Sequence, residues 1–171
     1  MKTITATFIC LLLTGCASAP VEPLRATAQL QPTKGSKTFG EATFEQVGGK
    51  VHAVIYVQGL KPGQEHGLHI HEVGDCSSGD GMSTKGHFNP LGKPHGRHEG
   101  AERHAGDLPS LKAGKDGRAK VDAMLDGIGI GDGPTDIVGR GLIVHADPDD
   151  FKTQPTGNAG ARIACGVIRA G

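Results

Sequence analysis

The chain of 171 residues is poor in several features that would point to common classes of protein. It has no Trp and only 4% aromatic residues, and no stretch of ten or more residues keeps a helical period of 3.6. Its 18 basic and 18 acidic residues leave a net charge of zero, so it lacks the basic field that favours nucleic acid and the acidic tail of a solvating segment. Any attraction for a charged ligand must therefore be local. The length favours one domain with a real core.

The N-terminal residues predict a targeting segment. Lys2 provides a positive end, and residues 4–13 form an apolar run that is too short to span a bilayer as a helix. Leu13-Thr14-Gly15-Cys16 resembles the bacterial lipoprotein box, in which the Cys is diacylated and becomes the new N-terminus. The alternative is cleavage after Ala19, which Pro20 disfavours. We therefore expect a signal peptide at 1–15, lipidation at Cys16 and a tether at 16–23, on a protein anchored to a membrane in the bacterial periplasm.

The four cysteines divide between this segment and the mature domain. Cys10 leaves with the signal peptide and Cys16 is the candidate for lipid attachment. Only Cys76 and Cys165 remain. Two cysteines in an exported protein most simply form one disulfide.

Residues 24–171 predict an all-β domain. The 28 glycines suit short strands joined by irregular loops. Hydrophobic alternation indicates strands at residues 24–31, 38–46, 50–58, 66–72, 118–125, 141–146 and 163–169. Two stretches without alternation, 73–117 and 147–160, are long enough to be site-building loops on a rigid scaffold. We expect a sandwich or barrel.

Histidines mark a candidate metal site. His69 and His71 alternate along one strand, so both imidazoles point away from the side of Leu68 and Ile70. Two histidines on a strand are more often surface residues. Four further histidines and a carboxylate argue against that reading: His87, His95, His104, Asp107 and His145.

So many ligands call for two metal ions. His95, His104, Asp107 and one more imidazole would close a tetrahedral zinc site of the structural type. His69, His71, His145 and one more imidazole would offer four nitrogens, a set that suits Cu(II). The spacing alone does not establish that one histidine is shared.

From residue 24 onward the chain resembles the copper–zinc superoxide dismutases. The resemblance is carried by the motifs Gly67-Leu68-His69-Ile70-His71-Glu72, His87-Phe88-Asn89-Pro90, His95, His104-Ala105-Gly106-Asp107, His145 and Gly157-Asn158-Ala159-Gly160-Ala161-Arg162. It implies a Greek-key β-barrel of about eight antiparallel strands. It also implies one copper, cycling between Cu(II) and Cu(I), and one structural Zn(II) per chain. The reaction implied is the conversion of superoxide to oxygen and hydrogen peroxide.

The resemblance also assigns roles to residues. The copper ligands implied are His69, His71, His87 and His145, and the zinc ligands are His87, His95, His104 and Asp107. His87 would bridge the metals and carry a proton, and Arg162 would guide the superoxide anion. Asp149 is the outer carboxylate expected to bind His69 and His95, His66 is expected to hydrogen-bond behind the copper strand, and Cys76 is expected to pair with Cys165.

Some features stay open or receive plainer readings. The interval between His145 and Arg162 is shorter than in the animal enzymes of the family. The charged residues that help to attract superoxide in those enzymes therefore cannot be matched one by one to residues of this chain. A homodimer is expected, with its surface undefined and a monomer as the alternative. His52 is read as a surface residue and His98 is unassigned. Asp132, Asp136 and Asp150 are read as solvated or turn-forming carboxylates.

Three other functions compete with dismutation. A non-catalytic copper-binding or copper-delivery module would use the same ligands but has no need of Arg162. A zinc hydrolase would want three ligands, an open water and a general base. A purely structural envelope protein leaves the ligand set unexplained.

Overall fold

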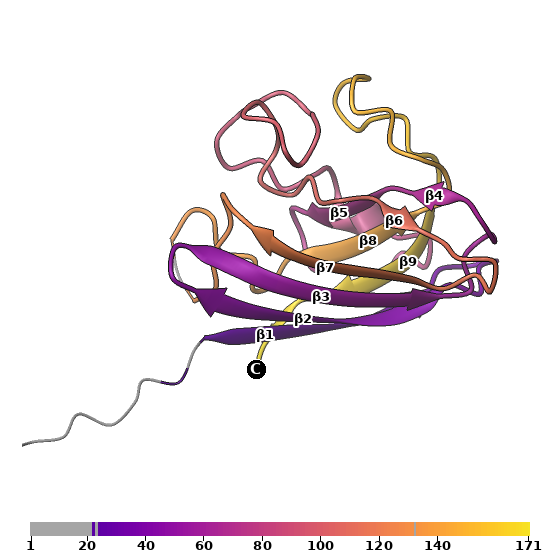
Figure 1. The fold of residues 1–171 in the computed structure, drawn as a ribbon, viewed down its shortest axis with the longest axis horizontal. Coiled ribbons are helices and arrows are strands. Elements are labelled where there is room, and N and C mark those ends of the chain that lie inside the picture. The colour runs from indigo at the N-terminus through magenta and orange to yellow at the C-terminus, as the bar shows by residue number, and fades with distance from the viewer. Residues whose placement is uncertain (1–21, 23, 132) are drawn as a thin grey trace, which may run out of the picture.

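The fold is described from a computed structural model that defines residues 22, 24–131 and 133–171 (Figure 1). The expected signal peptide and Cys16 lie outside these residues, as does Asp132. The strands are β1 Arg25–Pro32, β2 Phe39–Val47, β3 Lys50–Gln58, β4 Glu65–His66, β5 Leu68–His71, β6 Leu111–Lys112, β7 Ala119–Leu125, β8 Gly141–His145, β9 Arg162–Val167 and β10 Arg169–Ala170. One short 3₁₀ turn, η1 Met82–Thr84, lies between β5 and β6. The all-β expectation is confirmed.

A single curled sheet carries the fold. Its order is β5-β8-β9-β1-β2-β3-β7, with β10 beside β1 and a separate β4-β6 pair, and all these strand pairs are antiparallel. β1 joins the two halves because residues 25–30 pair with β2, whereas Gln31 and Pro32 pair with β9. The connections from β3 to β5 and from β7 to β8 cross between these halves, as Greek-key connections do. The antiparallel β-barrel is thus as predicted.

Alternating residues fill the barrel. Phe44, Ile55, Leu68, Ile70 and Leu142 are among its buried side chains. Each points inward because side chains on a strand alternate between the two faces of the sheet. Burying this apolar surface is the main favourable term that holds the barrel together.

One prediction about this pattern differs from the structure. The strand expected at residues 24–31 included Leu24, but β1 begins at Arg25, and Leu24, which precedes the first β1–β2 pair, is 54% exposed. Ile143 faces away from the core and is nevertheless fully buried. The reason is that the loop at Gly81 lies over it.

The outer side of β5 and β8 is covered by the two long loops. Figure 1 shows both loops, residues 73–117 and 147–160, rising on the same side of the barrel, beyond β5 and β8. They touch through Gln154, whose side chain accepts a hydrogen bond from His95 N at 2.8 Å and donates one to His95 O at 2.9 Å. The barrel is therefore the rigid support, and the two loops cover the side chains on the outer face of β5 and β8.

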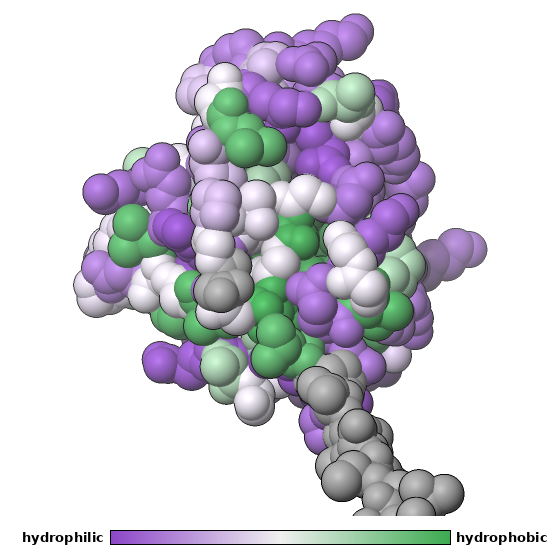
Figure 2. Space-filling model, turned by 90° about the vertical axis from the view of Figure 1, so that its left-hand side faces the viewer, coloured by the Kyte–Doolittle hydropathy of each residue, from purple (hydrophilic) through white to green (hydrophobic). Residues whose placement is uncertain are grey.

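The end of the barrel where β1 begins is partly apolar. Figure 2 shows this face, with hydrophobic residues gathered in its lower middle. Leu24 and Val47 are exposed there, at the start of β1 and the end of β2. None of the described residues forms a helix that is long and apolar enough to cross a membrane.

Candidate metal centre

Strands β5 and β8 bring three histidines to one surface. In their antiparallel register Leu68 lies opposite Val144 and His69 opposite Ile143, so the inward and outward sets coincide. His145 ends β8, and its N–H donates to Gly67 O at 2.9 Å. This register therefore places His69, His71 and His145 together on the outer face.

Backbone hydrogen bonds fasten the first loop onto β5. Ile70 N donates to Gly106 O at 2.9 Å, and Phe88 N donates to Ile70 O at 2.8 Å. His87 stands opposite His71, and Asp107 opposite His69, in isolated antiparallel bridges. Gly106 permits this close approach, because a Cβ there would collide with Ile70 O. The loop ligands are thus positioned by the strand that carries the other histidines.

The first cluster consists of His69, His71, His87 and His145. All four are buried, and one ligand atom from each lies within 4.8 Å of the others. The nitrogens without a hydrogen-bond partner in the described part of the chain include His69 Nδ1, His71 Nε2, His87 Nε2 and His145 Nε2. A buried polar atom left unpaired is costly, so four such nitrogens around one point indicate a metal ion. Four imidazoles suit copper.

The second nitrogen of each of these rings is fixed by an acceptor. His69 Nε2 lies 2.7 Å from Asp149 Oδ2, His71 Nδ1 lies 2.8 Å from Lys85 O, and His145 Nδ1 lies 3.2 Å from Gly160 O. These oxygens accept, so the ring nitrogen that faces each of them carries the hydrogen. The other nitrogen is left as a lone pair directed at the cluster, which is how neutral imidazole binds a metal.

The second cluster consists of His87, His95, His104 and Asp107, again with ligand atoms within 4.8 Å of one another. Asp107 Oδ1 lies 2.9 Å from His87 Nδ1, 3.0 Å from His95 Nδ1 and 3.4 Å from His104 Nδ1. The other carboxylate oxygen, Oδ2, accepts from Gly96 N at 3.1 Å and His104 N at 2.9 Å. Three nitrogens and one carboxylate oxygen are a closed tetrahedral set of the zinc type. His87 belongs to both clusters, through Nε2 to the first and Nδ1 to the second.

Asp149 connects the two clusters from behind. Its Oδ2 accepts from His69 Nε2 at 2.7 Å and its Oδ1 from His95 Nε2 at 2.9 Å, and Phe151 N donates to it at 2.7 Å. The Asp149 side chain is 2% exposed. Gly157 leaves room for it: its φ is +65°, and a side chain there would collide with Asp149 and with the His95 ring.

The electrostatics of the protein without metal already favour cations here. Burial is the first cause that lowers the pKa of His71, of His145 and of His87, the last to about 4, so these rings are neutral and ready to bind a metal. Burial also opposes charge on His95, but Asp107 and Asp149 outweigh it and raise its pKa to about 9. The two carboxylates therefore hold a proton on His95, which zinc has to displace.

Arg162 stands at the edge of the first cluster. It starts β9 and pairs with His145 across a β-bulge. Its Nη1 donates to Gly81 O at 2.6 Å and to Thr84 Oγ1 at 2.9 Å, and its Nη2 donates to Lys85 O at 2.6 Å. The guanidinium is thus held by the same loop carbonyl, Lys85 O, that orients His71.

The predicted disulfide is confirmed. Cys76 and Cys165 are bonded, with their Cα atoms 5.9 Å apart, and they are 89 positions apart in the sequence. The bridge ties the loop that contacts Arg162 to β9, the strand that carries Arg162. The loop that accepts the guanidinium's hydrogen bonds and the strand that carries Arg162 are therefore linked covalently.

The remaining predicted polar residues take lesser positions. His66 is buried and its Nδ1 donates to His145 O at 2.9 Å, so it supports a histidine of the first cluster without joining it. His98 Nδ1 donates to Asp107 O at 3.1 Å, behind the second cluster. His52 pairs with Asp122 at 2.9 Å on the outer surface of β3 and β7. The carboxylates of Asp136 and Asp150 accept backbone N–H groups in turns.

Two contributors escaped the sequence reasoning. Thr84 is fully buried and accepts from Arg162, and Gln154 joins the two loops at His95. Neither belongs to a residue type or a spacing that signals a metal site. Only their contacts show what they do.

Comparison with known proteins agrees with this geometry. The family model described as copper/zinc superoxide dismutase matches residues 38–168. The chain is 46% identical over 151 residues to superoxide dismutase (Cu-Zn) 2 of Brassica juncea, covering 84% of this chain and 96% of the relative. It is also similar to a solved structure titled as the clock protein EA4. That match has a TM-score of 0.78 and 40% identity, and it covers 90% of this chain and 98% of the other.

Proposed function

The chain belongs to the copper/zinc superoxide dismutase family, and we propose how its residues divide the work of converting superoxide to oxygen and hydrogen peroxide. The activity and the two metal cofactors are those of the family. What this chain adds is the arrangement: two buried clusters that share one imidazole, with an arginine at the edge of the first.

We assign copper to His69, His71, His87 and His145, and zinc to His87, His95, His104 and Asp107. The observation that carries the copper assignment is the convergence of four buried, unpartnered imidazole nitrogens. Zinc is supported by the donor set of the second cluster, three Nδ1 atoms and one carboxylate oxygen. When bound, copper supplies the one-electron redox chemistry, whereas zinc has none and serves structure and charge.

Arg162 is the group that binds and orients the anion. Its guanidinium is a permanent positive charge with a planar set of donors, and three hydrogen bonds to the loop fix where it points. It is partly exposed, so solvent and a small anion can reach it. A copper carrier has no use for such a group, and this favours catalysis over copper delivery.

His87 is the group that holds and returns a proton for peroxide. Its Nδ1 faces Asp107 in the second cluster, so Nε2 is the atom left to exchange a proton at the first. Asp149 and Lys85 O keep the neighbouring rings oriented throughout.

These assignments are tested by measuring the metal content and the rate of superoxide dismutation on the same sample. The mature protein should hold about one copper and one zinc per chain and should dismute superoxide. A protein that held both metals at full occupancy without dismuting superoxide would favour the delivery function instead.

We also propose that Cys16 is diacylated and anchors the protein in the bacterial periplasm, most simply as a homodimer. Two acyl chains give stable attachment where one is marginal. The support is the motif Leu13-Thr14-Gly15-Cys16 and the apolar run before it. Cys16→Ser should move the protein from the membrane fraction to the soluble periplasm. An unchanged fractionation would remove the anchor, and light scattering of detergent-free Cys16→Ser protein would decide between dimer and monomer.

A further inference from the structure

The four residues of the second cluster are not held to the barrel equally. His87 and Asp107 each form a bridge with β5, and Asp107 N donates to His104 O at 3.3 Å. His95 takes part in no backbone-to-backbone hydrogen bond within the described part of the chain. The next residue, Gly96, donates its N–H to Asp107 Oδ2 at 3.1 Å, which is a contact inside the cluster. His95 is therefore the member of the cluster that the barrel positions least.

The second loop holds His95 instead. Gln154 Oε1 accepts from His95 N at 2.8 Å, and Gln154 Nε2 donates to His95 O at 2.9 Å. A side-chain amide offers an acceptor and a donor side by side, so it pairs with the N–H and C=O of one residue as a neighbouring strand does. At the ring, Asp149 Oδ1 accepts from His95 Nε2 at 2.9 Å. One loop thus fixes both the backbone and the imidazole of His95.

A second contact between the loops lies two residues further along. The guanidinium carbon of Arg97 lies 4.1 Å from the centroid of the Phe151 ring, which is a cation–π distance. Phe151 has a φ of +58°, a left-handed conformation that is costly for a bulky side chain and free of that cost for glycine. The ring is thus present at the expense of local stability. In this turn Phe151 N donates to Asp149 Oδ1 at 2.7 Å, which helps to hold the carboxylate against His95.

The tip of the second loop depends on these side-chain contacts. Within residues 150–157, Asp150 N donates to Gly157 O at 2.9 Å and Gly157 N donates to Thr153 O at 2.7 Å. Among the described residues, no backbone-to-backbone hydrogen bond joins this tip to the barrel or to the first loop. The tip and His95 therefore hold each other in place.

We propose that Gln154 and the Arg97–Phe151 pair form a clasp between the two loops, and that these three residues are positioning residues for zinc. By fixing His95, the clasp sets how long the second cluster retains its zinc ion. The hydrogen bonds of Gln154 reach His95 and Lys152 O, and none of them reaches a histidine of the first cluster. Opening the clasp should therefore release zinc before copper. This inference rests on the zinc assignment made above.

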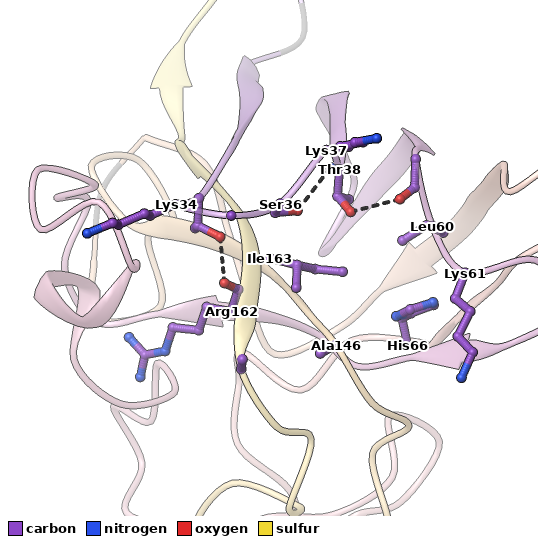
Figure 3. Close-up of a pocket in the computed structure, with 14 residues that line it drawn as sticks. Lys34, Ser36, Lys37, Thr38, Leu60, Lys61, His66, Ala146, Arg162 and Ile163 are labelled. Atoms are coloured by element: carbon purple, nitrogen blue, oxygen red, sulfur yellow. Dashed lines mark hydrogen bonds between the residues drawn. The ribbon is translucent and has the colours of Figure 1, made fainter.

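The clasp is also separate from the group that binds the anion. Figure 3 shows the Arg162 side chain running from the start of β9 toward the loop of η1. Its hydrogen-bond acceptors all lie within residues 81–85. Weakening the clasp should therefore leave the guanidinium in place.

The test measures zinc release from the fully metallated protein into an excess of a chromogenic chelator, while the visible absorbance of copper reports copper loss. Gln154→Met keeps the length of the side chain and removes both hydrogen bonds. It should speed zinc release about five- to thirtyfold, as expected for two hydrogen bonds of modest net worth. Phe151→Ala should speed it about two- to fivefold, whereas Phe151→Tyr keeps the ring and should release zinc at the native rate. Copper loss should stay within about twofold of native in each variant.

The matched control is Gln46→Met, which removes the hydrogen bonds of another glutamine, at the turn between β2 and β3 and outside both loops. It should leave zinc release within about twofold of native even where thermal stability falls. Cobalt(II) placed in the second cluster adds a spectroscopic readout. Its ligand-field bands should change in Gln154→Met, because His95 is held less firmly, and should be native in Gln46→Met.

Several results would overturn the clasp while leaving the zinc assignment intact. They are native zinc release or native cobalt bands in Gln154→Met, equal acceleration in Gln46→Met, and copper loss that accelerates as much as zinc loss. A native protein that bound no zinc would instead overturn the assignment on which the clasp rests.

Discussion

Replacing Arg162 by Gln would remove a positive charge at the edge of the copper cluster while keeping a polar side chain. The charge already reaches that cluster in the protein without metal. Burial is the main cause that lowers the pKa of His71 and His145, and Arg162 lowers both further. A superoxide anion that approaches the same nitrogens would experience the same field. For the anion the interaction with Arg162 is attractive, whereas for a protonated imidazole it is repulsive.

The size of the effect follows from Coulomb's law. A unit charge about 4 Å from the anion contributes about 1 kcal/mol in water and about 4 kcal/mol at an effective dielectric constant near 20. Arg162 is partly exposed, so the lower part of that range applies. Since each 1.4 kcal/mol is about tenfold in rate, Arg162→Gln should slow the second-order reaction roughly tenfold. Native activity should also fall with salt, because the Debye length shortens to about 8 Å at 0.15 M.

Pulse radiolysis of fully metallated protein across ionic strength is the assay. Arg162→Lys should retain part of the rate, because it keeps the charge but loses the fork that binds Gly81 O, Thr84 and Lys85 O. Thr84→Val should cause a smaller loss, because two of the three acceptors stay. Copper and zinc contents should equal those of the native protein in all three variants. Equal rate constants for native and Arg162→Gln protein at low salt would refute the reasoning.

Further predictions concern the metals and the disulfide. His87→Ala should impair both metal sites, whereas His104→Ala should chiefly impair the zinc site. Metal analysis of the purified variants checks this, and full occupancy of both sites in His87→Ala would contradict the shared ligand. Asp149→Asn should weaken metal affinity about 10- to 100-fold, because the amide has one accepting oxygen where the carboxylate has two, one for His69 and one for His95. Competition with a chelator measures this, and native affinity would show that the carboxylate is dispensable. Cys165→Ser should lower the free energy of unfolding by at most about 4–5 kcal/mol, given the long loop that the disulfide closes, and denaturant unfolding that gave the native value would argue against this contribution.

The strands and the parity of the strand histidines could be predicted from the sequence because both depend on a local period of two. Residues 50–58 alternate regularly, and β3 spans those residues. His69 and His71 lie outside the barrel for the same reason that Leu68 and Ile70 lie inside it. The alternating run also included Leu24, but this residue lies just before β1 and is exposed.

The shared ligand and the support of the site needed the tertiary structure. Spacing left open whether one histidine serves two clusters, and the answer depends on how Phe88 and Gly106 bond to Ile70 and so place His87. The anchoring of Arg162 by Thr84 is equally invisible in the sequence, because the two residues are 78 positions apart. Such contacts are set by the path of loops over the barrel. That path depends on backbone hydrogen bonds between segments far apart in the sequence, and on glycines that leave room for two backbones to approach closely. No local sequence pattern predicts either.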